Sequence, residues 1–273
     1  MSIYTHGHDE PVLRSHRWRT AANSAAYLLP LLRPDLSLLD VGAGPGTITA
    51  DLAELVGSVT ATEIDESVLA LSRAEIASRG LTNVRFAVQD VHQLSYPDDS
   101  FDVAHAHQVL QHVADPVRAL AELRRVTRPG GVVAVRDSDY AAFAWYPLLP
   151  ELDRWLELYR TIARANGGEP DAGRRLLSWA HQAGFEHVVA STSTWCFATP
   201  QDRQYWGGMW ADRIVNSAIA RQVVAAGLAT PAELAELRQG WLAWTADPDG
   251  CFSVLHGEIL CRVGDPAADR PSP

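Results

Sequence analysis

The sequence predicts an α/β protein with an open, doubly wound, mostly parallel sheet and helices on both faces. From residue 36 to 136, short apolar segments alternate with helical patterns of about 10–15 residues. The apolar segments are rich in valine and leucine on both faces, as strands between two helix layers are. A glycine turn, "VGAGPG" at 41–46, joins the first strand to the first helix. These features together indicate right-handed βαβ units.

The alternating region contains five expected strands and three expected helices. The strands are "LSLLDV", "VTATEI", "VRFAVQ", "FDVAHAH" and "GVVAVRD". The helices are expected at about 46–56, 66–79 and 115–127. The last begins with Asp115 as N-cap and Pro116 in the first turn, and it stops at the glycines after Pro129.

The segments before and after the alternating region have a different pattern of expected helices and strands. A helix is expected over about 16–32, ended by Pro34. Beyond 137, helices are expected over 146–182, interrupted at 166–173, and again over 200–245. Strands are expected at 187–195 and 252–263. We predict a helical N-terminal lid segment at 1–35 and a cofactor-binding core at 36–140. Substrate-side helices and the last two strands are expected at 141–263, with a helical cap insertion at about 200–250, and a disordered tail at 264–273.

Composition narrows the functional classes. The formal charge of −10 disfavours a nucleic-acid partner. The 273 residues include no lysine, which excludes a Walker A grip and lysine Schiff-base chemistry. Three cysteines without a CxxC pair suit a reducing compartment. No apolar run is long enough for a membrane span and no secretory signal is visible at the start, so we expect a cytoplasmic protein.

The glycine turn predicts an adenosine-containing ligand. Its spacing is GxGxG at Gly42, Gly44 and Gly46, whereas a dinucleotide fingerprint is GxGxxG and Thr47 stands where that pattern continues. Glu63 ends the second strand, where a carboxylate can accept hydrogen bonds from both ribose hydroxyls. Glycine lets the backbone approach such a ligand closely.

Four ordered segments resemble class I S-adenosylmethionine-dependent methyltransferases, most nearly the small-molecule enzymes of the ubiquinone/menaquinone-biosynthesis type. They are "LLDVGAGPGT", "VTATEID", "VQDVHQLSYPDDSFDVAHAHQVLQHVADP" and "ALAELRRVTRPGGVVAV". The resemblance covers about residues 36–137. It implies a Rossmann-like fold with a seven-stranded sheet whose last strand is antiparallel, and S-adenosyl-L-methionine as cofactor.

The resemblance also implies roles for single residues. Asp40 would orient the loop or the methionine amine, and the three glycines would line methionine and ribose. Glu63 would take the ribose hydroxyls. The remaining contacts that the resemblance implies are Ile64 on the adenine, Asp90 and Val91 at the adenine edge, and His107 and Gln108 near the sulfonium and its carboxylate end. Apart from the resemblance, Arg19 in the N-terminal stretch is a further candidate cofactor contact, because it can reach a carboxylate or wall off the methyl group.

Methyl transfer needs alignment more than a catalytic triad, and a general base only if the nucleophile loses a proton. Candidate bases are Asp137, Asp139 and His112, at or just beyond strand ends. A solvated loop carboxylate and a helix-cap histidine are the alternative interpretations. Asp137 and Asp139 could together hold Mg²⁺, but the rest of such a pattern is missing, so no metal is expected.

Eight of the nine tryptophans lie between Trp145 and Trp244, outside the alternating region. They predict either an aromatic substrate chamber or ordinary packing of the added helices. The candidate substrate contacts are Tyr4, His16, Tyr140, Trp145, Trp206 and Trp210. Residues 1–20 and 200–245 are expected to close over the cofactor, with Gly207 and Gly208 as a hinge.

The sequence therefore predicts a methyltransferase that acts on an O, N or C nucleophile of a small molecule. The alternative is a protein of the same fold that binds S-adenosylmethionine without transferring its methyl group. A nicotinamide oxidoreductase is disfavoured by Thr47, and a macromolecular methyltransferase by the acidity. A homodimer is a candidate assembly.

Overall fold

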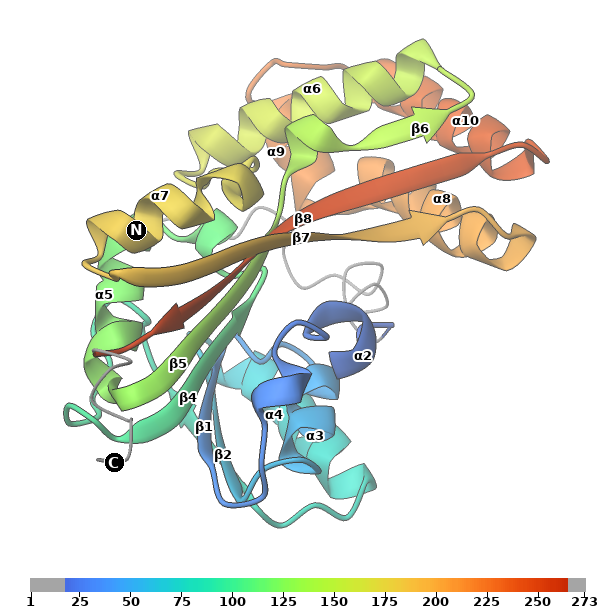
Figure 1. The fold of residues 1–273 in the computed structure, drawn as a ribbon. Helices are drawn as coiled ribbons and strands as arrows, with labels where there is room; N and C mark the ends of the chain where they lie inside the picture. The colour runs from blue at the N-terminus through green and yellow to red at the C-terminus, as the bar shows by residue number, and fades with distance from the viewer. Residues whose placement is uncertain (1–17, 265–273) are drawn as a thin grey trace.

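One eight-stranded sheet forms the centre of the molecule in the computed structural model, which describes residues 18–264 (Figure 1). The strands follow the order β3-β2-β1-β4-β5-β8, and β7 pairs with the other edge of β8. Their bounds are β1 Ser37–Val41, β2 Ser58–Glu63, β3 Val84–Val88, β4 Phe101–His107, β5 Thr127–Ser138, β6 Ala144–Tyr146, β7 His187–Phe197 and β8 Cys251–Arg262.

The strand directions confirm the predicted fold class. The pairs β1–β2, β2–β3, β1–β4 and β4–β5 are parallel, whereas β8 runs antiparallel to β5, β6 and β7. The sheet has one strand more than the seven expected. The extra strand, β6, pairs with the first residues of β8, while the later residues of β8 pair with β5. A β8 of twelve residues is long enough to hold both strands along one edge.

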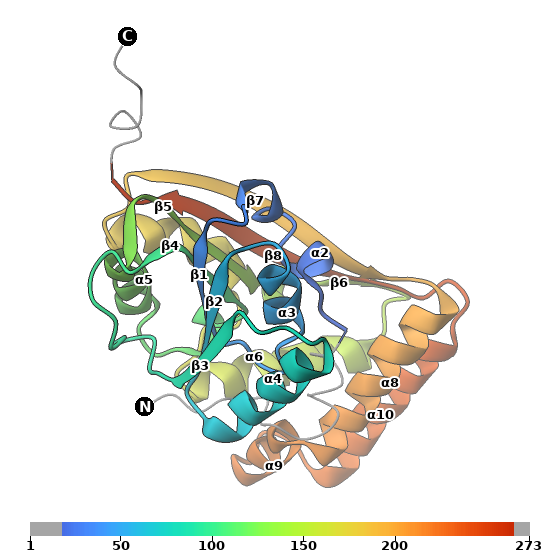
Figure 2. The ribbon, with the colours of Figure 1, turned by 90° about the horizontal axis from the view of Figure 1, so that it is seen from below.

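Helices cover both faces of the sheet (Figures 1 and 2). On one face, α2 and α3 pack over β1 and β4, with α4 beside them. On the other, α5 and α7 pack over β4 and β5. The bounds of these helices are α2 Ala21–Ser24, α3 Thr47–Ala53, α4 Glu66–Ser78, α5 Pro116–Val126 and α7 Leu176–Gln182.

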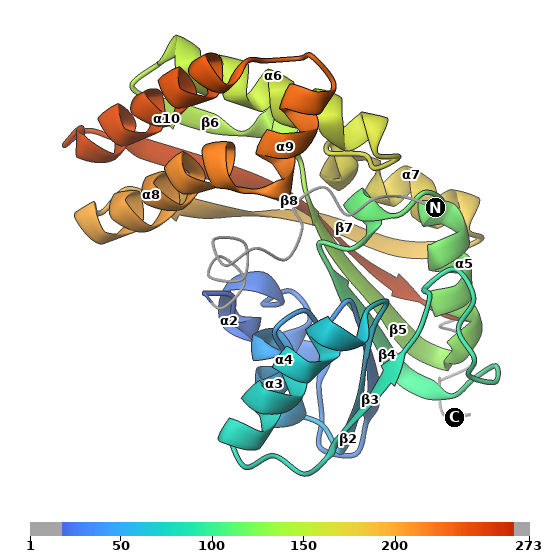
Figure 3. The same cartoon turned by 180° about the vertical axis from the view of Figure 1, so that it is seen from behind.

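A second body of helices surrounds the far ends of β7 and β8 (Figure 3). These helices are α6 Pro150–Ala165, α8 Pro200–Asn216, α9 Ala218–Ala225 and α10 Pro231–Ala246. Short 3₁₀ turns occupy Leu29–Leu31, Leu110–His112, Tyr140–Ala142 and Ala172–Arg175. The helices expected within 146–182 and 200–245 are therefore present, although the first stretch begins with β6 rather than a helix.

The helix expected over 16–32 is wrong for the described part of that range. The helix α2 has only four residues, capped by Thr20, whose hydroxyl accepts from the amide of Asn23 at 3.2 Å. A 3₁₀ turn follows at Leu29–Leu31. Pro30 lies inside that turn and has no amide hydrogen to donate, so an α-helix cannot run through it undisturbed.

The termini of α5 were predicted correctly. Asp115 accepts a hydrogen bond from the amide of Arg118 at 2.9 Å, and Pro116 occupies the first turn. The helix ends at Val126, one residue before β5 begins. Along residues 18–264, no helix combines the length and the apolar character that crossing a lipid bilayer requires.

Candidate functional site

A cavity of about 570 Å³ lies at the carboxyl ends of β1, β2 and β4. Ligands of open α/β sheets bind at this edge, outside the carboxyl ends of the strands. The cavity is lined by every residue predicted to bind the cofactor except Gly46: Arg19, Asp40, Gly42, Gly44, Glu63, Ile64, Asp90, Val91, His107 and Gln108.

The glycine turn between β1 and α3 needs its glycines for conformation and for space. Gly42, Gly44 and Gly46 have φ angles of 70°, 58° and 86°, values that other residues rarely adopt. A Cβ on Gly42 would lie 2.4 Å from Cγ2 of Val109. A Cβ on Gly46 would lie 2.8 Å from Cα of Ser72, so Gly46 permits helix packing instead of lining the cavity.

Glu63 joins the end of β2 to the glycine turn. Its Oε1 accepts from the Gly44 amide at 2.9 Å, and its Oε2 accepts from the Ile64 amide at 3.2 Å. Burial raises the pKa of Glu63, and these two backbone hydrogen bonds oppose that rise. The carboxylate is thus held at the cavity wall, where its remaining lone pairs can accept hydrogen bonds from hydroxyl groups.

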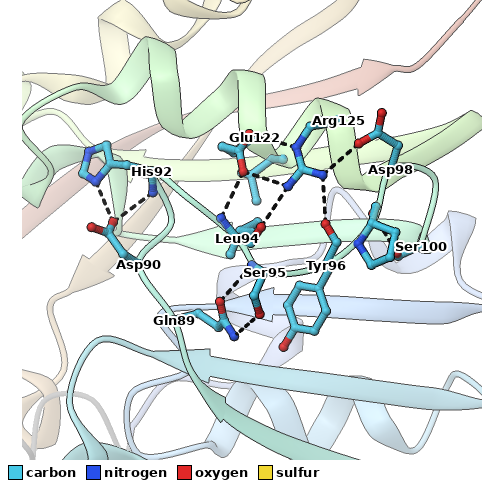
Figure 4. Close-up of polar contacts among 12 residues, drawn as sticks. Gln89, Asp90, His92, Leu94, Ser95, Tyr96, Asp98, Ser100, Glu122 and Arg125 are labelled. Atoms are coloured by element: carbon cyan, nitrogen blue, oxygen red, sulfur yellow. Dashed lines mark hydrogen bonds and ion pairs between the residues drawn. The ribbon is translucent and has the colours of Figure 1, made fainter.

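The loop after β3 carries Asp90 and is fixed by a network of polar contacts (Figure 4). Oδ1 of Asp90 accepts from the His92 amide at 2.9 Å and lies 2.7 Å from Nδ1 of the same residue. Burial alone would raise the pKa of Asp90, but the hydrogen bonds from His92 lower it. Arg125 of α5 donates to the carbonyls of Leu94 and Tyr96 at 2.9 and 2.8 Å, which anchors the loop.

Both carboxylate oxygens of Asp40, near the end of β1, contact polar groups of the protein itself. Oδ1 lies 2.7 Å from Nδ1 of His105 on β4, and Oδ2 accepts from the hydroxyl of Thr49 at 2.6 Å. The predicted role in orienting the loop fits this arrangement better than direct contact with an amine. His105 lines the cavity and is fully buried, although sequence reasoning did not select it. Only the spacing from His107, two residues further along the same strand, indicated that the two side chains share one face of the sheet.

The carboxyl end of β4 brings His107 and Gln108 to the cavity. Burial first, and then the positive charges of Arg136 and Arg19, keep the pKa of His107 well below its ordinary value. Neither ring nitrogen of His107 has a hydrogen-bond partner within residues 18–264. Gln108 adopts a φ of 54°, and its side-chain amide donates to the hydroxyl of Ser138 at 2.8 Å.

The three predicted catalytic residues are not brought together. His112 lines the cavity, and burial, assisted by Arg19 and Arg213, lowers its pKa to about 3. Asp137 and Asp139 are buried but are absent from the cavity wall. Asp139 is held by Arg174, whose Nε and Nη2 lie 2.6 and 2.7 Å from its oxygens.

Asp137 accepts from the Gln111 amide at 3.1 Å, and burial raises its pKa to about 7. Asp137 is the next-to-last residue of β5 and Asp139 directly follows that strand, against which the turn at Ala172–Arg175 packs. Neither carboxylate therefore forms part of the wall of the described cavity. Across residues 18–264, His, Cys, Asp and Glu side chains form no group of three or more suited to a metal ion.

The predicted aromatic chamber is not part of this cavity. Tyr140, Trp206 and Trp210 are buried in the core formed by α6, α8, α10 and the ends of β7 and β8, and Trp145 packs against that core. Their aromatic rings contact other aromatic side chains of this core; Trp206, for example, stacks on Phe197 with centroids 4.4 Å apart. Tyr4 and His16 lie outside the described residues.

The predicted hinge also differs from the structure. Gly207 and Gly208 lie inside the continuous helix α8. A Cβ on Gly207 would lie 2.0 Å from Oγ1 of Thr245 and 2.9 Å from the ring of Trp244. The glycine at 207 is thus explained by the close packing of α8 on α10.

Comparisons with known proteins agree with this geometry. Residues 39–135 match the family described as "Methyltransferase domain". A methyltransferase of Schizosaccharomyces pombe, described as uncharacterised, is 33% identical over 270 residues, which cover 95% of this chain and 96% of that protein. A ubiquinone/menaquinone biosynthesis C-methyltransferase of Vibrio parahaemolyticus is 31% identical over 174 residues, which cover 57% of this chain and 66% of that enzyme.

Among solved structures, the YcgJ protein of Bacillus subtilis is similar with a TM-score of 0.59 and 18% identity. The similarity covers 88% of this chain and 97% of that one. At this level of identity the likeness concerns the fold alone.

Proposed function

Because this chain belongs to the S-adenosylmethionine-dependent methyltransferases, we propose that it transfers the methyl group to an O, N or C nucleophile of a small-molecule acceptor. Family membership confirms the resemblance predicted from the four ordered segments, and S-adenosyl-L-methionine is the cofactor. The class of acceptor is the part that we propose. The observation that carries it is the single cavity that joins the glycine turn and Glu63 to the end of β4.

The residues present fit the cofactor. Gly42 and Gly44 form part of the cavity wall with positive φ angles and no side chains, and Glu63 lines the same cavity. We propose that Glu63 accepts from the ribose hydroxyls and Asp90 from the adenine amino group, with Ile64 and Val91 against the adenine ring. Ile64 is 66% exposed, so it presents an apolar surface to a ligand in this cavity.

When bound, S-adenosylmethionine supplies a methyl group on a positively charged sulfur, from which a neutral thioether departs. The residues of the chain contribute position and exclusion of water, which lower the barrier without a dedicated base. A volume of about 570 Å³ lies within the roughly 300–1,000 Å³ typical of small-molecule sites. This size fits the cofactor that we place there, while the charge of −10 disfavours nucleic acid as the acceptor.

The histidines of the cavity support catalysis by alignment. With a pKa of about 3, His112 is neutral near pH 7 and is a weak base. His107 is also neutral there, because burial and the neighbouring arginines oppose its protonation. Both can position an acceptor through hydrogen bonds, while proton removal by them is unfavourable. We therefore assign the chemistry mainly to proximity and orientation.

The predicted division of the chain remains a proposal. We propose that residues 1–35 and the insertion at about 200–250 cover the cofactor, around a core at 36–140. Hydrogen exchange with and without S-adenosylhomocysteine tests this cover: protection should increase at 200–215 as well as at the glycine turn. Protection confined to 40–65 and 88–112 would contradict it. A cytoplasmic homodimer is likewise proposed, and sedimentation tests the assembly.

The function is tested by calorimetry and a transfer assay with the full chain. S-adenosylhomocysteine should bind and NAD should not. With S-adenosylmethionine and a fractionated extract of small metabolites, S-adenosylhomocysteine should form only in fractions that also yield a product heavier by one methylene group.

Glu63→Gln provides the control for the site. The amide keeps one acceptor for Gly44 but loses a charged acceptor for ribose, so binding should weaken by about 1.5–3 kcal/mol. Heat with NAD and none with S-adenosylhomocysteine would overturn the proposal, as would binding without methyl transfer to any small-molecule fraction.

A further inference from the structure

Two of the three cysteines meet at one end of the sheet, far from the cavity in the order of the strands. Cys196 is the next-to-last residue of β7, and Cys251 is the first residue of β8. Their Sγ atoms lie 3.9 Å apart, although 55 residues separate them in the chain. The third cysteine, Cys261, lies near the other end of β8. The fold thus creates a thiol pair that the spacing of the cysteines in the sequence does not indicate.

The strand register explains why the two thiols meet. β7 and β8 are antiparallel, and Cys196 is paired with Ser253, two residues after Cys251. Side chains two residues apart on a strand point to the same face, so these three side chains share one face of the sheet. Phe197 and Phe252, which are also register partners, are fully buried on the opposite face. Their burial in the aromatic core holds the two strand ends together and leaves the thiols on the outer face.

The pair is accessible from solvent. Cys196 is exposed and Cys251 is partly exposed, whereas Cys261 is buried. An exposed thiol can attack a small-molecule disulfide, and a second thiol in contact with it can then displace the adduct. Cys196 and Cys251 meet both conditions. Cys261 does not, because a buried thiol is shielded from such a reagent.

We propose that Cys196 and Cys251 are a reversible oxidation site, which forms an internal disulfide by exchange with a small-molecule disulfide of the glutathione type. The Cys196 thiolate attacks one sulfur of glutathione disulfide, and one glutathione thiolate leaves. The Cys251 thiolate then attacks Sγ of Cys196 in the mixed disulfide, and the second glutathione leaves. The two protein thiols lose two electrons and two protons, and glutathione disulfide gains them as two thiols.

The bond requires only a local movement. A disulfide has an S–S distance of about 2 Å, so the sulfurs must approach by about 2 Å from their separation of 3.9 Å. Rotation of the two side chains about their Cα–Cβ bonds moves the sulfurs on this scale. Cys251 is also the first residue of its strand, where the backbone is less constrained than in the strand interior.

The disulfide closes a loop that contains three of the added helices. The helices α8, α9 and α10 all lie between the two cysteines (Figure 1). Oxidation therefore ties together the two points at which this helical segment leaves and rejoins the sheet. A crosslink restricts the unfolded chain, and its effect grows with the length of the closed loop. For the 55 residues closed here, we expect Tm to rise by about 5–15 °C.

The test equilibrates the full chain with mixtures of reduced and oxidised glutathione at about pH 8. Partial burial and then the contact with Cys251 raise the pKa of the Cys196 thiol, so a mildly alkaline pH supplies more of the reactive thiolate. The oxidised protein should be lighter than the reduced protein by two hydrogen atoms. Peptide mapping should join the peptides of Cys196 and Cys251, Tm should rise as stated, and dithiothreitol should reverse all three changes.

Single substitutions separate the internal bond from simple adducts. Cys196→Ser and Cys251→Ser each leave one thiol of the pair, which should form at most a mixed disulfide with glutathione, without the rise in Tm. Cys261→Ala is the matched control, because it removes a cysteine from the same strand β8 but should leave oxidation and the rise in Tm as in the wild type. If this variant does not fold, the two serine variants still decide the question.

Three results would overturn the proposal. They are a wild-type protein that keeps both thiols in excess glutathione disulfide, one that carries glutathione adducts without an internal bond, and an internal bond that leaves Tm unchanged. Mass and Tm are read without cofactor or acceptor, so these outcomes are independent of the proposed function.

Discussion

Replacement of Asp137 by asparagine should stabilise the protein, and more at high pH than at low pH. The carboxyl group is fully buried, and its Oδ2 has no hydrogen-bond partner in the described chain. Burial raises the pKa of Asp137 from 3.8 to about 7, against the opposing effect of the Gln111 and Leu110 amides and Arg136. At about 1.4 kcal/mol per pH unit, the ionised form costs about 4 kcal/mol in the folded state.

The direction of the pH dependence follows from proton binding. Between about pH 4 and pH 7 the folded state binds more protons at Asp137 than the unfolded state does, so the free energy of unfolding falls as pH rises. Below about pH 4 both states are protonated and the cost disappears. Asparagine resembles the protonated acid and does not ionise. Its advantage over aspartate should therefore grow by about 2–3 kcal/mol from about pH 5 to about pH 8.

Urea unfolding followed by tryptophan fluorescence measures this difference at each pH. The neighbouring Asp139 supplies a control of opposite sign, because its buried carboxylate is paired with Arg174 at 2.6 and 2.7 Å. Asp139→Asn should lower the free energy of unfolding at about pH 8, since it weakens the two charge-assisted hydrogen bonds that Arg174 donates to this buried side chain. A pH-independent effect of Asp137→Asn, or destabilisation at about pH 8, would refute the reasoning.

Two further predictions concern space and charge. Gly42→Ala should destabilise the fold by more than the roughly 1–2 kcal/mol that a positive φ costs alanine, because its Cβ would lie 2.4 Å from a Val109 methyl group, and it should weaken S-adenosylhomocysteine binding. Gly80→Ala is the control, since Gly80 has a φ of 68° and no atom within 4 Å of the added Cβ. Glu258→Gln should cost about 3–5 kcal/mol in urea unfolding, because Arg136, 1% exposed, would keep a buried charge without its carboxylate.

Each of these has a result that would contradict it. Equal losses in the two alanine variants would show that the close approach of Val109 has no energetic weight. For the buried pair, the double variant Arg136→Met with Glu258→Leu should be less destabilised than Glu258→Gln, because no charge remains buried. A double variant that is less stable than the single one would mean that packing, and not the uncompensated charge, governs this site.

The sequence determined the core of the fold and the cofactor. Alternating apolar and helical segments predict parallel strands because burial on both faces leaves a direct mark on composition. The glycine turn and Glu63 could also be predicted from the sequence. Close approach of the backbone to the cofactor and a carboxylate at a strand end each depend on a short stretch of the chain. Local signals failed at residues 18–32, the described part of the expected long helix, where the structure has a short helix and a 3₁₀ turn around Pro30.

Only the tertiary structure decided which side chains meet. Asp40 and His105 are 65 residues apart and touch because β1 and β4 are neighbours in the sheet, an order that strand patterns do not reveal. Asp137 lies near the end of β5, yet its side chain is buried in the interior, where it accepts from the amide of Gln111. The tryptophans after 145 pack added helices onto β7 and β8. The sequence predicts that most of these tryptophans are buried. Whether they surround a ligand or pack against each other depends on how the helices pack.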